Sequence, residues 1–575
     1  MARIPYGISS FERIRNKRED FVYVDKTRFI EQLEETSFII HLRPRRFGKS
    51  LFVSMLESYY DVFSTDRFDD LFSGLHIHKN PTMNRNHYYI LRFNFSGIAT
   101  KDFDTMMDGF LNKVKSSVAS FISKYQLNIE IKDYGTPAMI LNALLEAFNR
   151  LNLEHKVYIL IDEYDHFTNA VLNNGLEGFM TLVTQGGLVR SFYEVIKEQS
   201  ELNVVNRLFM TGVMSVSLDS MTSGFNVATN LTTVSTFADM MGFTADEVKQ
   251  LLQVPKLGSP KEAVGLTEVE QETVYEIFRQ NYNGYLFSEE SEIKVFNSTL
   301  IMYYLKHYVP GKKLLKNIVD PNLNQSSKTI SGIVDVKNKE ANDAIVEEIV
   351  KHKGVSATLS AFIDIDKKFD KNDFITLLFN IGFLTIKEQG MLTKFEIPNK
   401  IIEAIYFGYM RELAELRYHY KVDVATQEHA LLEMGEQGKI NAITHLVSDF
   451  LQHTSGRNAI DFRELDIKLT YLKFLFPTNQ FFVFDEFPVK HGYTDLTILK
   501  SAGSYSKYEF LVELKHVKKG KKEETTKARI AEKFTEGVNQ IAAYMKDKRM
   551  SGRSHLKKFV VVFVGFEVAR IEEIE

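Results

Sequence analysis

The 575-residue sequence contains no cysteine. This absence excludes disulfide bonds, cysteine-ligated zinc and thiol catalysis, and it fits a reducing cytoplasm. Only 11 prolines and no low-complexity linker occur, so we expect domains that abut rather than hang on tethers. The N-terminus has no apolar signal core, and the longest apolar runs, such as residues 559–566, are too short to span a bilayer. We therefore expect a soluble cytoplasmic protein without a membrane partner.

An excess of charge of one sign is also missing. The formal net charge is −4 and the charges are interspersed, so no global nucleic-acid signal exists and any basic surface must be local. The apolar fraction of 44% is ample for folded cores. A chain of this length should hold three or four domains.

Near the N-terminus the sequence has the order strand, loop, helix. The apolar run 38–42 precedes Arg43-Pro44-Arg45-Arg46-Phe47-Gly48-Lys49-Ser50, and a helical pattern begins at Leu51. This is the order of a phosphate-binding P-loop, in which Lys49 reaches the β- and γ-phosphates and Ser50 ligates Mg²⁺. Backbone N–H groups near Gly48 would face the phosphates. The alternative is a Gly-Lys-Ser sequence at an ordinary helix start.

The loop departs from the full G-x-x-x-x-G-K-[ST] pattern at its first position, which is Arg43. The loop must therefore turn without the freedom that glycine has at positive φ. A second motif supports the nucleotide interpretation. The apolar strand pattern 157–161 ends in Asp162 and Glu163, the usual arrangement of a Mg²⁺-binding carboxylate beside a water-activating one. Together the two motifs predict binding and hydrolysis of ATP or GTP.

Up to about residue 240 the sequence reads as α/β. Strand candidates at 38–42, 88–95, 157–161 and 207–212 alternate with helical patterns, which predicts a largely parallel sheet with its ligand at the carboxyl ends of the strands. Lys49, Asp162 and Thr211 all lie at such ends. The Thr211 hydroxyl could sense the γ-phosphate, or it could cap a turn.

From about residue 241 to 425 the pattern is mostly helical. Thr244 and Glu247 predict an N-terminal capping box. Residues 373–406 predict a helix, a short hairpin (383–386 and 394–397) and a second helix, an order that resembles a winged helix. Winged helices bind DNA in some proteins and serve as packing modules in others.

The last 150 residues carry a second group of candidate residues. Asp495 lies in the strand candidate 493–498, and Glu513 and Lys515 share one face of the strand candidate 508–515. Two adjacent strands could bring the three side chains together. Two acids and a lysine suit Mg²⁺-dependent phosphodiester hydrolysis, with the carboxylates holding the metal and the lysine orienting water. The alternative is a solvated Glu-x-Lys pair.

Further residues could join this site. Glu486, beside the strand candidate 481–484, is a candidate fourth acid, and Gln540 and Tyr544 lie four residues apart on one helix face. Residues 513–533 hold eight basic and four acidic side chains. Such a stretch suits the phosphate-contacting rim of a nuclease, or it is a solvated loop.

Several motifs resemble the AAA-ATPase-like family of bacterial proteins. They are residues 4–7, 23–27, 43–50, 160–165, 211–213, 282–285 and 295–298. In that family an arginine at the first glycine position of the loop is usual. The family typically ends in a PD-(D/E)XK nuclease-superfamily domain, whose two core motifs residues 492–496 and 513–515 resemble, although Tyr493 and Thr494 depart from a commoner Gly-Arg-x-Asp form. The resemblance covers nearly the whole chain and implies mobile-element or host-defence roles by association only.

We therefore expect an α/β chain with a P-loop AAA-like ATPase domain at 1–240, a helical lid and winged-helix-like region at 241–425, and a restriction-endonuclease-like PD-(D/E)XK domain at 426–575. The leading interpretation is an ATP-dependent or ATP-gated nuclease that acts on DNA. A second is a nucleotide-dependent switch or assembly module that binds nucleic acid without cutting it. A third, a DNA-loading motor, needs a homo-oligomer in which an arginine reaches a neighbour's γ-phosphate. Arg45 and Arg46 are candidates for phosphate contact, and the alternatives are a structural ion pair or a role within the same chain.

The candidate residues fall into three groups. The catalytic candidates are Glu163, Asp495, Glu513 and Lys515. The nucleotide-binding candidates are Arg45, Arg46, Phe47, Gly48, Lys49, Ser50, Leu51, Asp162 and Thr211. The Mg²⁺-ligand candidates are Ser50 and Asp162 with ATP, and Glu486, Asp495 and Glu513 at the nuclease site.

Overall fold

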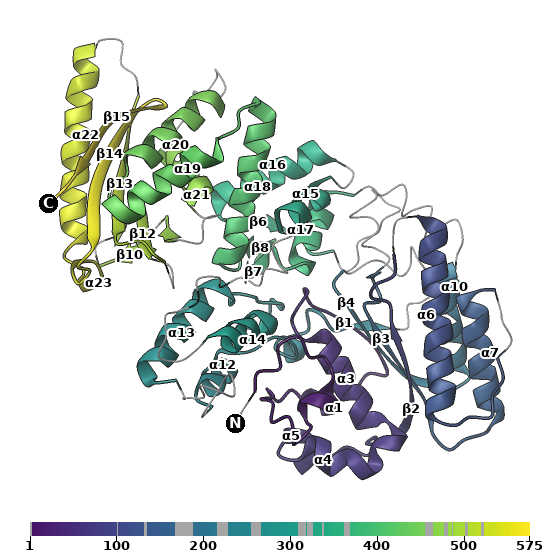
Figure 1. Ribbon diagram of the computed structural model, residues 1–575. Helices are drawn as coiled ribbons and strands as arrows, with labels where there is room; N and C mark the ends of the chain where they lie inside the picture. The colour runs from purple at the N-terminus through teal and green to yellow at the C-terminus, as the bar shows by residue number, and fades with distance from the viewer. Residues whose placement is uncertain are drawn as a thin grey trace. The chain divides into compact units, whose positions relative to one another are not determined.

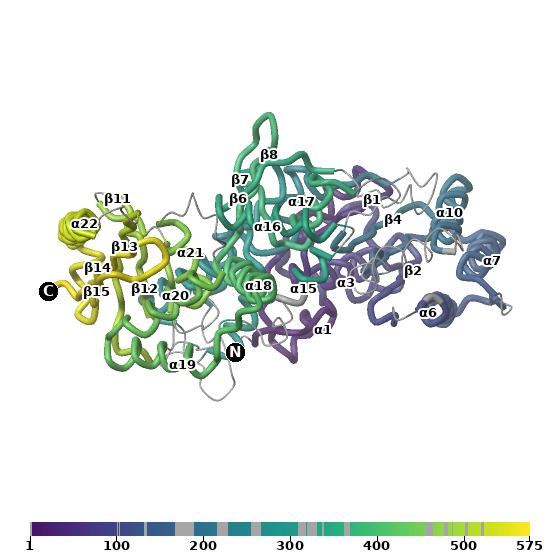
Figure 2. Tube along the Cα trace, turned by 90° about the horizontal axis from the view of Figure 1, so that it is seen from above, coloured from purple at the N-terminus to yellow at the C-terminus, as the bar shows by residue number. Residues whose placement is uncertain are grey.

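The computed structural model describes residues 3–99, 102–131, 135–166, 188–214, 228–254, 266–308, 315, 318, 326–335, 338–360, 369–454, 464–475, 481–485, 487–490, 492–500, 504–518 and 523–575. Contacts divide the chain into two compact units, residues 1–311 with 331–402, and residues 312–330 with 403–575. Figures 1 and 2 show the elements of both units. The domain boundaries near residues 240 and 425 remain predictions.

The first unit is built on a parallel five-stranded sheet with the strand order β2-β3-β4-β1-β5. Its strands are β1 (Phe38–Leu42), β2 (Tyr88–Asn94), β3 (Lys156–Asp162), β4 (Val205–Gly212) and β5 (Thr229–Asn230). The four predicted strands are therefore confirmed. Most of their side chains are buried, as expected for a parallel sheet that is covered on both faces.

Helices cover both faces of this sheet. In Figure 1, α1 and α3 lie on one side, and α6, α7 and α10 lie on the other. The helices of this part are α1 (Phe11–Ile14), α2 (Phe29–Leu33), α3 (Lys49–Tyr60), α4 (Phe68–Phe72), α5 (His76–Lys79), α6 (Phe103–Lys124), α7 (Pro137–Arg150) and α10 (Leu188–Glu201).

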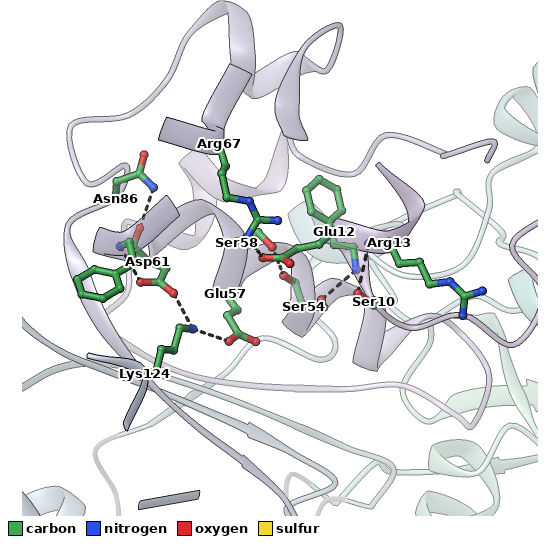
Figure 3. A network of polar contacts seen from close by, with 12 residues as sticks. Ser10, Glu12, Arg13, Ser54, Glu57, Ser58, Asp61, Arg67, Asn86 and Lys124 are labelled. Atoms are coloured by element: carbon green, nitrogen blue, oxygen red, sulfur yellow. Dashed lines mark hydrogen bonds and ion pairs between the residues drawn. The ribbon is translucent and has the colours of Figure 1, made fainter. Parts of the chain in front are cut away.

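Helix α3 begins at the P-loop lysine and is fixed at several points along its length (Figure 3). The Phe11 N–H donates to Ser54 Oγ at 3.0 Å, which ties α3 to α1. At its far end, Lys124 Nζ of α6 lies 3.0 Å from Glu57 Oε1 and 2.6 Å from Asp61 Oδ2. These contacts fix the position of α3 and therefore of the residues in its first turn.

The helical middle of the first unit follows the sheet. It comprises α12 (Ala245–Leu252), α13 (Glu268–Asn281), α14 (Ser298–His307), α16 (Lys339–His352) and α17 (Lys371–Asn380), and α15 (Ser326–Val334) crosses from one unit to the other. The predicted capping box is confirmed: Thr244 Oγ1 accepts from the Glu247 N–H, and Glu247 Oε2 accepts from the Thr244 N–H.

The predicted winged-helix-like order is also present. Helix α17 is followed by the hairpin β7 (Thr385–Glu388) and β8 (Thr393–Glu396). A third strand, β6 (Gly354–Ala357), pairs with β8 to give the order β6-β8-β7. We call α16, β6, α17, β7 and β8 the winged-helix-like module.

The second unit contains a mixed five-stranded sheet with the order β15-β14-β13-β12-β9, in which only β13 and β14 are parallel. In Figure 1, α22 lies on one face of this sheet, and α20 and α21 lie on the other. Its strands are β9 (Phe481–Phe484), β12 (Leu496–Lys500), β13 (Glu509–Val517), β14 (Leu556–Val564) and β15 (Glu567–Glu573), beside a small hairpin of β10 (Pro488–Val489) and β11 (Gly492–Tyr493). Its helices are α18 (Lys400–Tyr418, beginning in the first unit), α19 (Val424–Leu432), α20 (Asn441–Thr454), α21 (Glu464–Leu475), α22 (Glu523–Tyr544) and α23 (Lys548–Ser551).

One predicted strand is divided. The sequence predicted a continuous strand over residues 493–498, whereas Thr494 and Asp495 lie between β11 and β12. Asp495 thus precedes β12 and is free of that strand's alternation. Among the helices in the described parts of the chain, none is long and apolar enough to cross a membrane.

Candidate active sites

The P-loop connects β1 to α3, and its lysine is buried. Lys49 Nζ donates to the backbone carbonyls of Arg43 and Pro44, each at 3.0 Å. Burial lowers the pKa of Lys49, and the Asp165, Asp162 and Glu163 carboxylates counteract this effect. The ammonium therefore lies beside three acids at the carboxyl ends of the strands, where a nucleotide phosphate is expected.

The loop makes its left-handed turns at Arg46 (φ 73°) and Gly48 (φ 93°), and Arg43 is absent from the positive-φ positions. A glycine at the first position is therefore unnecessary for the turn. The Arg43 guanidinium instead lies inside the protein, with 1% of the residue exposed, and donates to the carbonyls of Thr232, Phe237 and Ala238.

The other candidate residues of the loop occupy different environments. Arg45 is exposed, and Arg46, Ser50 and Leu51 are half-buried. The Phe47 ring is buried against two aromatic rings of the helical middle, so any contact between Phe47 and phosphate must come from its backbone. The roles of Arg45 and Arg46 at a nucleotide or at a subunit boundary remain predictions.

Asp162 ends β3 with 0% of its surface exposed, and neither carboxylate oxygen forms a hydrogen bond with a described residue. Burial raises the pKa of this carboxyl, and the nearby Ser50 hydroxyl is the first of the groups that lower it. Buried carboxylates are normally paired or coordinate a metal. The two unpartnered oxygens beside Ser50 and Lys49 therefore fit a Mg²⁺ ion carried by a nucleotide.

Glu163 follows directly and adopts a left-handed backbone conformation, with φ 54°. This conformation is unusual outside glycine and occurs often at functional sites. His166 Nδ1 lies 3.4 Å from Glu163 Oε2, while His166 Nε2 lies 2.9 Å from the Ile98 carbonyl. The hydrogen bond with the imidazole is the main cause that lowers the pKa of Glu163, and this contact also orients the carboxylate.

Thr211 pairs with Asp162 across the sheet, at the end of β4. Its hydroxyl donates to the His41 carbonyl at 2.8 Å, a structural contact between β4 and β1. This contact engages the hydroxyl proton. A role of Thr211 at the γ-phosphate remains a prediction.

Asp165 is a residue whose part in this site the sequence did not reveal. Its Oδ2 accepts from the N–H groups of Val213 and Met214, at 2.9 and 2.7 Å. A Cβ on Gly212 would lie only 2.1 Å from Asp165 Oδ1, so glycine is required where the two strand ends meet. The glycine in Thr-Gly-Val was the available signal for this close approach.

At the C-terminal sheet the three predicted residues converge. Lys515 Nζ lies 2.7 Å from Glu513 Oε1 and 3.8 Å from Asp495 Oδ2. Asp495 is held in place because its Oδ2 accepts from the Leu514 N–H at 3.0 Å. Two carboxylates and an ammonium thus occupy one small volume between the start of β12 and the middle of β13.

These side chains are not a solvated pair. The side chains of Glu513 and Lys515 are 1% and 6% exposed, and that of Asp495 is 21% exposed. Glu513 and Lys515 share one face of β13 with Leu511 and Val517, which belong to the apolar core packed against α22. Even a paired buried ion pair is often no more stable than well-packed apolar residues in its place, so a structural explanation for this pair is poor.

The electrostatics of this site favour a bound cation. Burial, followed by the Asp495 charge, raises the pKa of Glu513, and Glu513 Oε2 forms no hydrogen bond with a described residue. The described residues contain no group of three or more His, Asp or Glu side chains that could hold a metal ion. Mg²⁺ commonly uses one or two protein carboxylates together with substrate phosphate oxygens and water, so Asp495 and Glu513 fit it. Glu486 lies outside the described residues.

Two further side chains border this site. Burial and the Asp495 charge raise the pKa of Glu464, and Lys515 lowers it, which places this first residue of α21 close to the site. Burial and the Glu513 and Asp495 charges likewise raise the pKa of Tyr544. The four-residue spacing predicted Tyr544 and Gln540 on one face of α22, but Glu464 gave no signal because it lies apart from both core motifs. Most lysines of the 518–522 stretch lie outside the described residues.

Comparison with known proteins agrees with this geometry. Residues 5–222 match a family model described as predicted AAA-ATPase, and residues 465–573 match one described as PD-(D/E)XK nuclease superfamily. A protein of Azotobacter chroococcum mcd 1 described as "Uncharacterized protein in vnfD 5'region" is 27% identical over 428 residues, which are 72% of this chain and 72% of the relative. The chain combines an AAA-ATPase-like domain at residues 5–222 with a PD-(D/E)XK nuclease superfamily domain at residues 465–573.

Proposed function

We propose that this protein binds and hydrolyses ATP with Mg²⁺ in its first unit and cleaves DNA phosphodiester bonds with Mg²⁺ in its second unit. The observation that carries the nuclease assignment is the buried Glu513–Lys515 pair, which interrupts an apolar strand face next to Asp495. The observation that carries the nucleotide assignment is the buried Asp162 carboxylate near Lys49. Neither of its oxygens has a hydrogen-bond partner among the described residues.

At the nucleotide site, Lys49 would bind the β- and γ-phosphates, and Ser50 and Asp162 would hold Mg²⁺. Glu163 would accept the proton of the attacking water, and its contact with His166 positions the carboxylate for this role. The metal would supply positive charge to the phosphate oxygens.

At the nuclease site, Asp495 and Glu513 would hold Mg²⁺, and the Leu514 carbonyl could add a ligand. Lys515 would orient the attacking water, since its ammonium is fixed by Glu513 at 2.7 Å. The metal would lower the pKa of that water and stabilise charge on the phosphate. Gating of this reaction by ATP, the choice of DNA substrate, a homo-oligomeric state and a role in mobile-element or defence biology belong to the same proposal.

The test is incubation of the full chain with linear duplex, circular duplex and single-stranded DNA, with Mg²⁺ or chelator, and with or without ATP. Phosphate release and DNA cleavage are followed in the same samples, and ATP binding is measured by the shift in melting temperature. We expect Mg²⁺-dependent cleavage of at least one DNA, and ATP binding that Lys49→Ala abolishes. DNA binding without cleavage under every condition would instead identify a nucleotide-dependent switch that binds nucleic acid.

A further inference from the structure

Residues 283–287 lie between α13 and α14, outside the segments 5–222 and 465–573 that match the two family models. We call residues 283–287 the strut. They belong to the same compact unit as the P-loop and the winged-helix-like module. Their contacts on two sides are the basis of the inference.

On one side the strut contacts the P-loop. The Phe47 ring meets the rings of Tyr285 and Phe287 edge to face, with centroids 4.9 and 5.5 Å apart. The Arg43 guanidinium lies over the Phe287 ring, 4.2 Å from its centroid. Edge-to-face ring pairs and cation–π contacts depend on orientation, so a change in the loop alters these contacts directly.

On the other side the strut contacts the winged-helix-like module and the residues that follow it. The Leu286 N–H donates to Thr385 Oγ1 of β7 at 2.7 Å, and the Phe287 and Phe379 rings lie 6.0 Å apart. Asn399 Nδ2 donates to the Asn283 carbonyl at 2.9 Å. A Cβ on Gly284 would lie 1.9 Å from the Pro398 carbonyl oxygen, so the backbones meet without space between them.

Lys49 cannot keep both of its present hydrogen bonds if its ammonium contacts two phosphates of a bound ATP, because it has only three N–H donors. Lys49 now donates to the carbonyls of Arg43 and Pro44. A P-loop lysine contacts the β- and γ-phosphates of a bound nucleotide, so at least one of these two bonds must be exchanged for a phosphate contact. The two carbonyls belong to Arg43 and Pro44. The Arg43 guanidinium lies over the Phe287 ring of the strut. Pro44 packs against Gly382, between α17 and β7, where an added Cβ would lie 3.0 Å from the proline ring.

We propose that the strut couples the P-loop to the winged-helix-like module, so that ATP binding changes the packing of α17 and the β7–β8 hairpin. The proposal rests on the proposed binding of ATP. Closely packed elements shift between discrete arrangements rather than deforming continuously, which is why small changes at the loop reach the module. ATP binding would thus first change the packing of the winged-helix-like module, before any effect on the second unit.

The test measures hydrogen exchange by mass spectrometry on the full-length Glu163→Gln chain, with and without MgATP. ATP should slow exchange in peptides covering residues 43–60 and should change exchange in peptides covering 371–396 by at least twofold. Slower exchange at 43–60 with no change at 371–396 would overturn the coupling and leave ATP binding intact. No effect in either region would overturn ATP binding and, with it, the coupling.

Two buried threonines of the module provide the matched pair. Thr385→Val removes the acceptor of the Leu286 N–H, whereas Thr376→Val removes only a bond from the Ser360 N–H within the module. We expect Thr385→Val to lose at least half of the ATP response at 371–396 and Thr376→Val to keep it, with both chains protected at 43–60. An equal response in the two variants would show that the strut is not the route.

Discussion

The two candidate sites each contain a buried lysine beside carboxylates, but the lysines are held differently. Lys49 is the first residue of α3 and donates to two carbonyls of the preceding loop, and burial lowers its pKa. Lys515 lies in the middle of a sheet and donates to Glu513, and its acidic neighbours, Glu513 first, outweigh burial and raise its pKa. The candidate nuclease residues Asp495, Glu513 and Lys515 are therefore already together, whereas Lys49 of the candidate nucleotide site would exchange at least one carbonyl contact for phosphate in the proposed complex.

This difference separates two functions that a lysine can have. A side chain on a sheet, fixed by a carboxylate, can orient water without moving, as efficient catalysis requires. A side chain at a helix start, held by weaker contacts with the carbonyls of the preceding loop, can change its contacts when a ligand binds. The predictions below test this contrast, beginning with the largest effect.

The largest effect is expected at the assembled site. Asp495→Ala, Glu513→Ala and Lys515→Ala should each lower DNA cleavage about 10³-fold or more, because Mg²⁺ would lose a ligand or the water its orienting group. ATP hydrolysis should stay unchanged. The control is Glu509→Gln on the same strand, whose carboxylate pairs with Arg553. Normal cleavage in all three alanine variants would show that these three residues have only a structural role.

At the nucleotide site, Glu163→Gln should lower the rate constant of ATP hydrolysis roughly 10²–10³-fold, because an amide cannot accept the proton of the attacking water. ATP binding should persist, seen as an unchanged ATP-dependent rise in melting temperature. The matched control is Glu194→Gln on α10, a half-exposed residue that pairs with Arg190. Wild-type turnover in Glu163→Gln would place the general base elsewhere.

A third pair of variants tests how rigidly the nuclease site is supported. A Cβ on Gly537 of α22 would lie 2.7 Å from Val560 and 3.5 Å from Glu513 Cγ. Gly537→Ala should therefore destabilise the second unit by about 1–3 kcal/mol and reduce cleavage. Gly408→Ala on α18 meets nothing within 4 Å and should raise stability by up to about 1 kcal/mol. Chemical denaturation distinguishes the two, and equal stabilities would contradict this packing.

The smallest effect is expected where the P-loop meets the winged-helix-like module. Gly382→Ala would press against Pro44 and should weaken ATP binding by about three- to tenfold, because coupling between two sites acts in both directions. Gly74→Ala has a similar backbone φ, 81° against 83°, but its Cβ would meet no atom within 4 Å. It controls for backbone strain. Titration with a fluorescent ATP analogue measures both, and equal weakening would leave strain as the explanation.

Local patterns predicted much of this structure. The four strands of the first sheet, the Thr244–Glu247 capping box and the convergence of Asp495, Glu513 and Lys515 followed from apolar runs, cap residues and strand alternation. These features depend on residues close together in the sequence or on a single strand pairing. Such features can therefore be predicted from local sequence patterns.

Features that depend on distant segments could not be predicted. Besides the neighbouring Leu42 carbonyl, the Arg43 guanidinium donates to carbonyls of residues 232–238, and the sequence does not show that these pack on the loop. Glu464 reaches the nuclease site from a helix that precedes β9. The break of the predicted strand at Thr494 accompanies contacts outside the ladder of β12: the Thr494 N–H donates to the Phe487 carbonyl at 3.1 Å, and the Thr494 hydroxyl lies 2.7 Å from Thr497 Oγ1.

The charged pair on β13 also has a consequence for the evolution of this domain. Replacing a buried ion pair with well-packed apolar residues is often neutral or stabilising, so a lineage released from selection for cleavage would gain from losing the pair. Drift at positions 513 and 515 should therefore run toward residues such as leucine and methionine. In any related chain, an apolar pair at these two positions would indicate a domain that has retained the fold and lost the proposed cleavage activity.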